Sequence, residues 1–558
     1  MAIPAISTAS PPPARRRPAG PPGWPLLVAG LAVCLGYLAS EIYTLGRLGF
    51  PLDDSFIHLQ FAKNLWAGHG LSYNAGEFVT GSTAPLWTAL LALLFALPGN
   101  VYLWAQALGI AFYLAGIDAT RRLGLELDLS PSLASFAAVL TLVSGPLVWS
   151  ALSGMEVPLF VLLSLWGMIL HLRERRDPAR APLSLGVLAV SVLARPEGAL
   201  LLVLALVDRL LVFRREEGTL AWTHPELRRL AAGGLLAVLA LAGPLLFYRW
   251  AGGSFLPTTF AVKSGGRFRQ WLPDLHYLHF VIYIFFRVQP WMVLAAGAGV
   301  LALVERLGTR RDRGLLPALW LLGLPFAYSL VTPPVGNGAI AGNFGRYYFP
   351  LFPPLVLLGV LGMARAASAL APGVRLGRAR FPIAALFAAL LLWPSVSDLI
   401  AGAGRYVQNV GNVEDSDVKV AYWLRDRLPP QAVLAVNDIG AVKYLLPNRI
   451  LDLVGIANPE IYQEVVRAAA HGVRWDEAIF ASMSARRPDY VVIFPNWFPR
   501  LSVDPRFKPL LLLKVPDNIT MGGSELVVYA TPWTRYPLRP SPGAPAAAAT
   551  GRPAAPPG

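Results

Sequence analysis

The chain has 558 residues, of which 55% are hydrophobic and only 15% are charged, and its mean hydropathy is +0.51. This composition argues against a chain of soluble domains and predicts that most of the protein lies in lipid. Lysine plus arginine outnumber aspartate plus glutamate by 48 to 33. Multi-spanning proteins hold such an excess in cytoplasmic loops, so the charge does not indicate a nucleic-acid partner. The one cysteine, Cys34, excludes an intrachain disulfide and a zinc cluster of cysteines.

Both ends of the chain are rich in proline and alanine. Residues 1–23, with Arg15, Arg16 and Arg17, and residues 537–558 have too few apolar side chains for a core, so we expect both to be disordered. The apolar segment 24–46 follows the arginines directly and is long enough to cross a bilayer of roughly 30 Å. A cleaved signal peptide is the alternative, but the apolar part is long and no small-residue cleavage pattern follows it.

Apolar segments continue to residue 400 and predict an α-helical polytopic membrane domain, residues 24–400, with about eleven transmembrane helices. Basic residues cluster on alternate loops, which predicts a cytoplasmic N-terminus. Residues 84–98 and 277–286 do not fit this alternation as full spans, so we expect interfacial or re-entrant helices there. The other segments after the first are 100–119, 132–150, 157–173, 181–195, 198–213, 229–250, 289–307, 315–332, 347–364 and 381–400.

The segment 401–536 differs from the rest in its hydrophobic pattern. Short strand patterns at 432–436, 450–453, 490–494, 511–515 and 525–530 alternate with helical patterns at 418–428, 459–470 and 475–485. With eleven spans before it, this segment lies outside. The sequence therefore predicts a multi-pass protein of the plasma (inner) membrane with a small C-terminal extracytoplasmic α/β domain.

The first outside loop, residues 47–99, contains the most polar motif near the membrane. Asp53 and Asp54 precede a predicted helix whose apolar residues repeat every four positions, and His58 follows Asp54 by one turn. Two adjacent acids at the mouth of a membrane cavity are candidates for a general base or a hard-cation site. A helix cap formed by one of these carboxylates is the alternative interpretation.

Other ionisable residues fall on the same outer face in this topology: Glu156, Arg195, Glu197, Lys263 and Arg346. Ionisable groups near lipid usually face a cavity or a partner, although each alone is equally explained by a side chain that reaches to water. Acids and cations at one depth suit the transfer of a sugar from a lipid phosphate. Cations would hold the departing phosphate, and a carboxylate would accept the proton of the attacking hydroxyl.

With these residues the sequence resembles the GT-C superfamily of multi-spanning glycosyltransferases, and most of all its bacterial arabinofuranosyltransferases and mannosyltransferases of the cell envelope. The likeness runs from about residue 24 to 535. Its motifs are Asp53-Asp54, Asn64, Gly68-His69-Gly70, Tyr73-Asn74, Gly76-Glu77, Pro85-Leu86-Trp87, Gly154-Met155-Glu156, Arg195-Pro196-Glu197-Gly198 and Arg346-Tyr347.

The resemblance implies a polyprenyl-phosphate-linked sugar donor in the membrane lipid and an envelope glycan, lipid or protein acceptor. It implies catalytic roles for Asp53, Asp54 and Glu156, and these three are also the expected ligands if a divalent cation (Mg, Mn or Ca) takes part. Donor phosphate binding is expected from Lys263, Arg346 and Arg195. Substrate binding is expected from His58, His69, Asn74, Glu77, Trp87, Glu197 and Tyr347.

Two questions stay open from the sequence. In the outer domain, Asn437-Asp438-Ile439-Gly440 follows a strand and forms either a turn or a ligand-binding loop that orients the acceptor. The competing functions are a transporter or lipid flippase, and a non-catalytic envelope-assembly protein. A transporter predicts charges near mid-span and related halves, whereas the charges here cluster at one rim.

Overall fold

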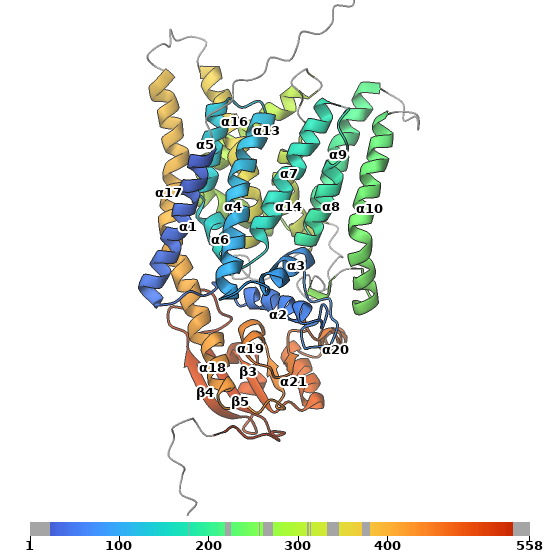
Figure 1. Ribbon diagram of the computed structural model, residues 1–558, viewed down its shortest axis with the longest axis vertical. Helices are drawn as coiled ribbons and strands as arrows, with labels where there is room; N and C mark the ends of the chain where they lie inside the picture. Colours follow the sequence, from blue (N-terminus) through green and yellow to red (C-terminus); the bar gives the residue numbers. More distant parts are fainter. Residues whose placement is uncertain are drawn as a thin grey trace, which may run out of the picture.

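The computed structural model describes residues 23–177, 179–217, 225–255, 257–259, 272–307, 309, 312, 314–331, 345–370 and 380–539. A helical bundle forms one end of the molecule and a smaller domain with a β-sheet forms the other (Figure 1). The terminal segments that we expect to be disordered lie almost entirely outside the described residues, and so does Lys263.

Each apolar segment predicted as a span coincides with a helix or a bent pair of helices. Among the described residues, six helices are long and apolar enough to cross a membrane, or up to eight if each bent pair is one span. The predicted number of about eleven therefore stays a prediction. The helices are α1 (Trp24–Leu45), α4 (Val101–Glu126), α5 (Pro131–Leu142), α6 (Gly145–Leu152), α7 (Val157–Arg176), α8 (Ser184–Ala194), α9 (Gly198–Glu217), α10 (Pro225–Gly252), α13 (Pro290–Arg306), α14 (Leu316–Val331), α16 (Phe352–Leu370) and α17 (Arg380–Val413).

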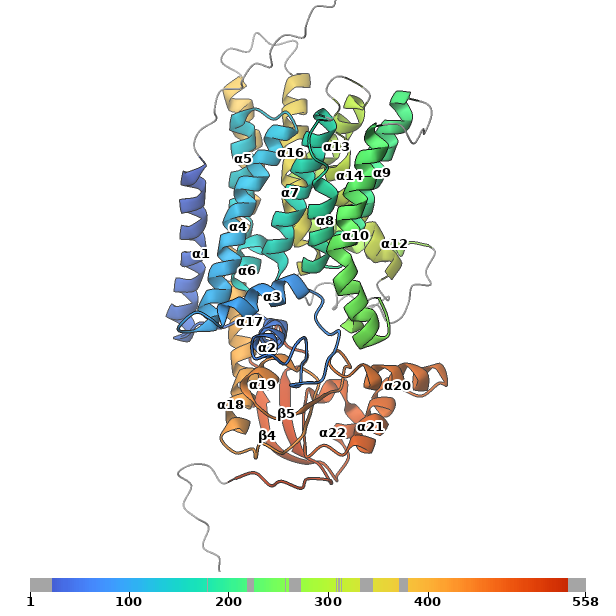
Figure 2. The ribbon, with the colours of Figure 1, turned by 45° about the vertical axis from the view of Figure 1, so that its right-hand side comes forward.

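Two shorter helices occupy the segments predicted to be interfacial or re-entrant. Helix α3 (Pro85–Leu94) lies across the end of the bundle (Figure 2). Helix α12 (Leu275–Val288) meets α13 at an angle of 115°, and α5 meets α6 at 58°. A proline stands in the first turn of α3, α6 and α13, where its missing N–H costs no helical hydrogen bond.

The C-terminal domain is built on a five-stranded sheet with the order β2-β1-β3-β5-β4. Strands β1 (Leu434–Val436), β2 (Ile450–Asp452) and β3 (Tyr490–Ile493) are parallel, and β4 (Lys508–Lys514) and β5 (Glu525–Ala530) add an antiparallel edge. The helices are α19 (Gly440–Leu445), α20 (Pro459–Ala470), α21 (Trp475–Arg486) and α22 (Pro499–Ser502), with a 3-10 turn, η3 (Pro495–Trp497). The five strands and the helices α20 and α21 lie within a few residues of where the sequence pattern places them, whereas α19, η3 and α22 were not predicted.

Helix α2 (Asp54–Trp66) lies between the bundle and the C-terminal domain and packs against α19 (Figures 1 and 2). The long helix α17 leaves the bundle and passes through a π-helical turn, η2 (Glu414–Val418), into α18 (Lys419–Arg425). The loop that follows the carboxyl end of the parallel strand β1 leads into α19, and α19 packs against α2. This loop therefore lies next to α2. Such loops are where ligands and functional side chains gather in α/β domains.

Candidate functional site

Most of the charged residues singled out from the sequence lie at the end of the bundle that faces the C-terminal domain. They come from α2, from the turn between α6 and α7, from the break between α8 and α9, and from η1 (Arg346–Leu351). The turn between α6 and α7, the break between α8 and α9, and η1 are far apart in the chain. Their charged side chains nevertheless meet next to α2, where they form two ion-paired groups.

The first group joins α2 to η1. The Asp54 Oδ2 atom lies 2.6 Å from Arg346 Nη2, and 30% of the Asp54 side chain is exposed against 6% for Arg346. The Arg346 guanidinium also lies 5.3 Å from the centre of the Tyr347 ring, and that of Arg195 lies 5.4 Å from the same ring. The Nη1 atom of Arg346 is buried and has no hydrogen-bond partner among the described residues. Two cations therefore flank one aromatic ring beside a partly exposed carboxylate.

The second group is largely buried, with side-chain exposures of 7% for Arg195, 4% for Glu156 and 13% for Glu197. Arg195 donates from Nη1 to Glu156 Oε1 at 2.5 Å and from Nη2 to Glu197 Oε1 at 2.6 Å. His58 Nε2 lies 3.2 Å from Glu156 Oε2, and the Tyr328 hydroxyl donates to Glu197. Burial alone would raise the pKa of Glu156, but the Arg195 guanidinium and the His58 ring lower it to about 2. Glu156 is thus a stably ionised partner of Arg195 and a very weak base.

The local sequence explains how these side chains reach the site. Gly154 has a φ of 72°, a left-handed conformation that side chains other than glycine rarely adopt, and this turn places Glu156 at the start of α7. Arg195 is extended, with φ −154° and ψ 139°, because the following Pro196 disfavours the helical conformation before it. Helix α8 therefore ends before Arg195. The Gly-Met-Glu and Arg-Pro-Glu-Gly motifs each form a turn between two helices, and the two turns bring Glu156 and Arg195 together as an ion pair.

Asp53 does not share this environment. Its Oδ2 and Oδ1 atoms accept the backbone N–H groups of Gly440 and Ala441, each at 2.6 Å, so it caps α19 of the C-terminal domain. It makes no side-chain capping hydrogen bond to its own helix, α2. The predicted cap of α2 by Asp53 is therefore wrong: Asp53 stabilises instead the first turn of a helix 387 residues away in sequence.

The remaining predicted substrate-binding residues separate into three environments. Asn74 pairs with the backbone of Ile450 through two hydrogen bonds of 3.0 Å, and Glu77 forms an ion pair of 2.7 Å with Arg449. Both therefore attach the first loop to the C-terminal domain. Trp87 is fully buried and donates to the Gly154 carbonyl at 3.0 Å, which supports the turn before Glu156. His69 is exposed.

The arrangement of the predicted metal ligands does not favour binding of a divalent cation. Both oxygens of Asp53 accept backbone N–H groups, and Glu156 is paired with Arg195. Among the residues that the structure describes, no group of three or more histidine, cysteine, aspartate or glutamate side chains is arranged to hold a metal ion. The described carboxylates therefore do not fit a divalent cation.

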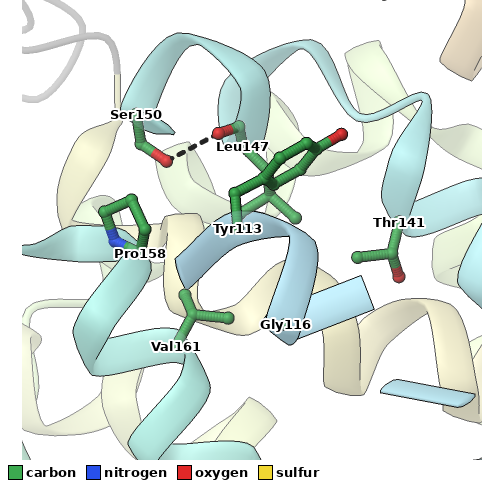
Figure 3. Close-up of a pocket in the computed structure, with 7 residues that line it drawn as sticks. All are labelled: Tyr113, Gly116, Thr141, Leu147, Ser150, Pro158 and Val161. Atoms are coloured by element: carbon green, nitrogen blue, oxygen red, sulfur yellow. Dashed lines mark hydrogen bonds between the residues drawn. The ribbon is translucent and has the colours of Figure 1, made fainter. Parts of the chain in front are cut away.

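Two hollows lie away from these charges. One, inside the bundle, is lined by Tyr113, Gly116, Thr141, Leu147, Ser150, Pro158 and Val161 (Figure 3). Its volume of about 10 Å³ is too small for a sugar. The other, of about 610 Å³, is lined in part by Glu305, Arg306 and Arg365, between α13 and α16. It lies toward the end of α16 remote from η1, so neither hollow belongs to the site.

Three residues of this region were missed or undervalued in the sequence. Tyr328 lies within the apolar α14 and carries no signal of its polar contact with Glu197. Asp417, in the π-helical turn η2, is fully buried, although it belongs to the visibly acidic run 414–417. Asp438 lies two residues before Gly440, whose N–H group donates to Asp53, and only the folded domain arrangement reveals this proximity.

Comparison with known proteins gives two sequence matches. A family described as a domain of unknown function, DUF8728, matches residues 405–536. A terminal beta-(1->2)-arabinofuranosyltransferase of Mycobacterium tuberculosis is 30% identical over 349 residues, which cover 55% of this chain and 52% of that protein. The chain thus aligns with about half the length of this curated relative.

Two solved structures share the architecture. ArnT from Cupriavidus metallidurans in the apo state matches with a TM-score of 0.55 and 15% identity, over 91% of this chain and 98% of that chain. The Archaeoglobus fulgidus oligosaccharyltransferase in complex with Zn and sulfate matches with a TM-score of 0.54 and 13% identity, over 84% and 67%. The chain therefore has the GT-C fold of multi-spanning membrane glycosyltransferases.

Proposed function

We propose that the protein transfers a sugar from a polyprenyl-phosphate donor to an envelope glycan, lipid or protein acceptor on the extracytoplasmic side. The observation that carries the proposal is the pair formed by Asp54 and Arg346, a partly exposed carboxylate beside a buried cation at the end of the bundle that faces the C-terminal domain. The mycobacterial relative makes arabinofuranose the first donor sugar to test. The clustering of the charges at one end argues against a transporter, whose charges are expected near mid-span.

Asp54 is the general base in this proposal. Asp53 has both oxygens committed to α19, and Glu156 is held ionised by Arg195, so neither is suited to accept a proton from an acceptor hydroxyl. Asp54 is more exposed than either, and its present partner is the cation that a donor phosphate would also attract. We assign the phosphate to Arg346, whose buried Nη1 atom has no hydrogen-bond partner among the described residues, and to Arg195; Lys263 is a further proposed ligand.

The reaction follows as a single displacement. The donor phosphate draws the Arg346 guanidinium, which releases Asp54 from its ion pair. The acceptor oxygen then attacks the anomeric carbon as its proton passes to Asp54. The bond from that carbon to the phosphate oxygen breaks, and polyprenyl phosphate leaves with its new charge held by Arg346. The configuration at the anomeric carbon inverts.

The test uses the full chain in lipid nanodiscs with radiolabelled polyprenyl-phosphate arabinofuranose, mannose or glucose and an envelope glycan extract. Wild type should transfer label from one donor. Asp54→Asn should lower turnover by about 10²- to 10⁴-fold, the usual contribution of a general base. The matched control is Asp426→Asn, because Asp426 is half exposed at the end of α18. Equal turnover in wild type and Asp54→Asn would refute the assignment, and transfer from none of the donors would refute the function.

A further inference from the structure

The larger of the two hollows lies between α13 and α16, at the end of the bundle opposite the C-terminal domain (Figure 1). Its volume of about 610 Å³ is in the range of sites that bind small organic ligands. The proposed transfer reaction takes place at the other end of the bundle, so this hollow has no part in it. In a membrane, either water or lipid fills such a space, and the side chains that line it decide which.

The hollow follows from the way the two helices pack. Partway along their length, α13 and α16 touch backbone to backbone. A Cβ atom on Gly299 would lie 2.0 Å from the Leu358 carbonyl oxygen, and one on Gly362 would lie 1.9 Å from that of Ala295. Toward the C-terminal ends of both helices, long charged side chains replace these small residues, so the backbones cannot stay in contact. The close contact and the opening beyond it are therefore both set by the sequence.

Two arginines line the hollow, one from each helix. Arg306 of α13 donates from Nη1 to the Leu127 carbonyl at 3.2 Å, which uses one of the five N–H groups of its guanidinium. Arg365 of α16 pairs with Glu305, and its Nη2 atom lies 2.6 Å from Glu305 Oε1. Because 41% of the Arg365 side chain and 59% of the Glu305 side chain are exposed, this pair stabilises the fold little, and a competing anion can displace it. Two cations and one acid leave the lining with an excess positive charge.

Two hydroxyl groups complete the polar part of the lining. Thr309 donates to the Arg306 carbonyl at 2.7 Å, and Ser368 donates to the Ala364 carbonyl at 2.7 Å. A hydroxyl group whose proton is used in this way presents its oxygen as an acceptor. The hollow thus offers cations to a phosphate and acceptors to hydroxyl groups. A glycerol phosphate carries both partners, whereas a phosphate on a hydrocarbon chain or a phosphocholine lacks the hydroxyl groups.

The surroundings of the hollow favour a lipid over a soluble anion. Ala302 and Leu361 form an apolar part of the lining. On the surface of α13, Leu301 and Val304 are exposed and lie within two turns of Arg306, where acyl chains would cover them. A soluble phosphate would gain nothing from these side chains, but a lipid bound by its headgroup would bury them.

We propose that the hollow binds the headgroup of an anionic glycerophospholipid of the phosphatidylglycerol type. Arg306 and Arg365 hold the phosphate, and Thr309 and Ser368 accept from the glycerol hydroxyl groups. On binding, Arg365 exchanges Glu305 for the phosphate. Clustered arginines attract anionic lipid to one side of a membrane, and six more follow the two helices in the sequence: Arg310, Arg311, Arg313, Arg375, Arg378 and Arg380.

The test is a titration of the full chain in neutral detergent with phosphatidylglycerol, read by native mass spectrometry and by the unfolding temperature. Wild type should retain one molecule of this lipid and unfold at a higher temperature with it, and phosphatidylcholine with the same acyl chains should have neither effect. Arg306→Gln and Arg365→Gln should each weaken binding by about fivefold. Glu305→Gln should strengthen binding by about two- to fivefold, because it removes the acid that competes for Arg365.

The matched control is Arg122→Gln. Arg122 stands near the end of α4 that Arg306 contacts, and it is half exposed and paired with Asp118, but it does not line the hollow. This variant should bind phosphatidylglycerol as wild type does. If Arg306→Gln fails to fold because the Leu127 carbonyl loses its donor, the opposite shifts of Arg365→Gln and Glu305→Gln decide alone.

Equal retention of phosphatidylcholine and phosphatidylglycerol would overturn the inference, as would binding of wild-type strength in the arginine variants that fold. Polyprenyl phosphate and glycerol 3-phosphate serve as competitors. Displacement of phosphatidylglycerol by an equal concentration of either would show that the hollow serves another phosphate, and it would also overturn the inference. These measurements need neither donor nor acceptor, so their result is independent of the transfer assay.

Discussion

Replacing Glu156 with glutamine should reduce stability while sparing chemistry. The Arg195 guanidinium lies 2.5 Å from Glu156 Oε1, and burial beside this cation and His58 leaves the pKa of Glu156 at about 2 instead of 4.5. At 1.36 kcal/mol per pKa unit, the folded protein favours the ionised form by roughly 3 kcal/mol. Since the pKa is lowered, this stabilisation is present above about pH 4.5 and lost as the pH falls through about 2. Glutamine keeps an acceptor but not the charge, so we expect a loss of about 1.5–3 kcal/mol.

The assay is thermal or denaturant unfolding of wild type and Glu156→Gln in the same nanodiscs, together with turnover per folded molecule. Glu156→Gln should unfold more readily at neutral pH, and its deficit should shrink in acid. Its turnover should stay within about tenfold of wild type, well short of the loss expected from Asp54→Asn. Equal stability combined with a loss of turnover as large as that of Asp54→Asn would show that Glu156 is catalytic and that our division of roles is wrong.

Two further predictions concern the domain contact. Gly440→Ala should weaken the contact between α19 and α2 by about 1–3 kcal/mol, because the added Cβ atom would meet the Asp53 backbone. Gly404→Ala, where the added Cβ atom has open space around it, is the control and should leave this contact unchanged. Hydrogen exchange of the α19 amides measures both variants, and equal protection of α19 in the two would contradict the packing. Asn74→Ala should cost about 2 kcal/mol because it leaves the Ile450 N–H and carbonyl without their partner. Glu77→Gln should lower the free energy of unfolding by under about 1 kcal/mol, because the Glu77–Arg449 ion pair is half exposed. The unfolding midpoints of the two variants measure this difference. A larger loss of stability in Glu77→Gln than in Asn74→Ala would contradict the prediction that Asn74 contributes more to the contact.

The fold was largely predictable because its signals are local. Apolar runs of bilayer length mark the helices, and alternating short runs mark the strands of the C-terminal sheet. The number of membrane spans does not follow from these local signals, because α8 and α14 are short and α5 and α12 end at bends whose angles depend on neighbouring helices. Length and hydropathy alone do not distinguish a tilted span from a re-entrant helix.

The candidate site was predictable as a set of residue types but not as a set of roles. Spacing and topology place Asp54, Glu156 and Arg195 on one face, yet the sequence does not tell which acid pairs with which cation. The assignment of Asp53 to α19 depends on a contact between segments far apart in the chain. Helix-capping rules describe the first turn of a helix and carry no information about which distant carboxylate fills it.

The most direct test is a structure of the full chain with a non-transferable polyprenyl-phosphonate sugar bound in nanodiscs. Our account predicts phosphonate oxygens within about 3 Å of the Arg346 guanidinium. It also predicts that the Asp54 carboxylate is freed from Arg346 and faces the acceptor side of the anomeric carbon. A phosphonate bound elsewhere, for example beside Arg306 and Arg365 at the opposite end of the bundle, with the Asp54–Arg346 pair intact, would contradict it.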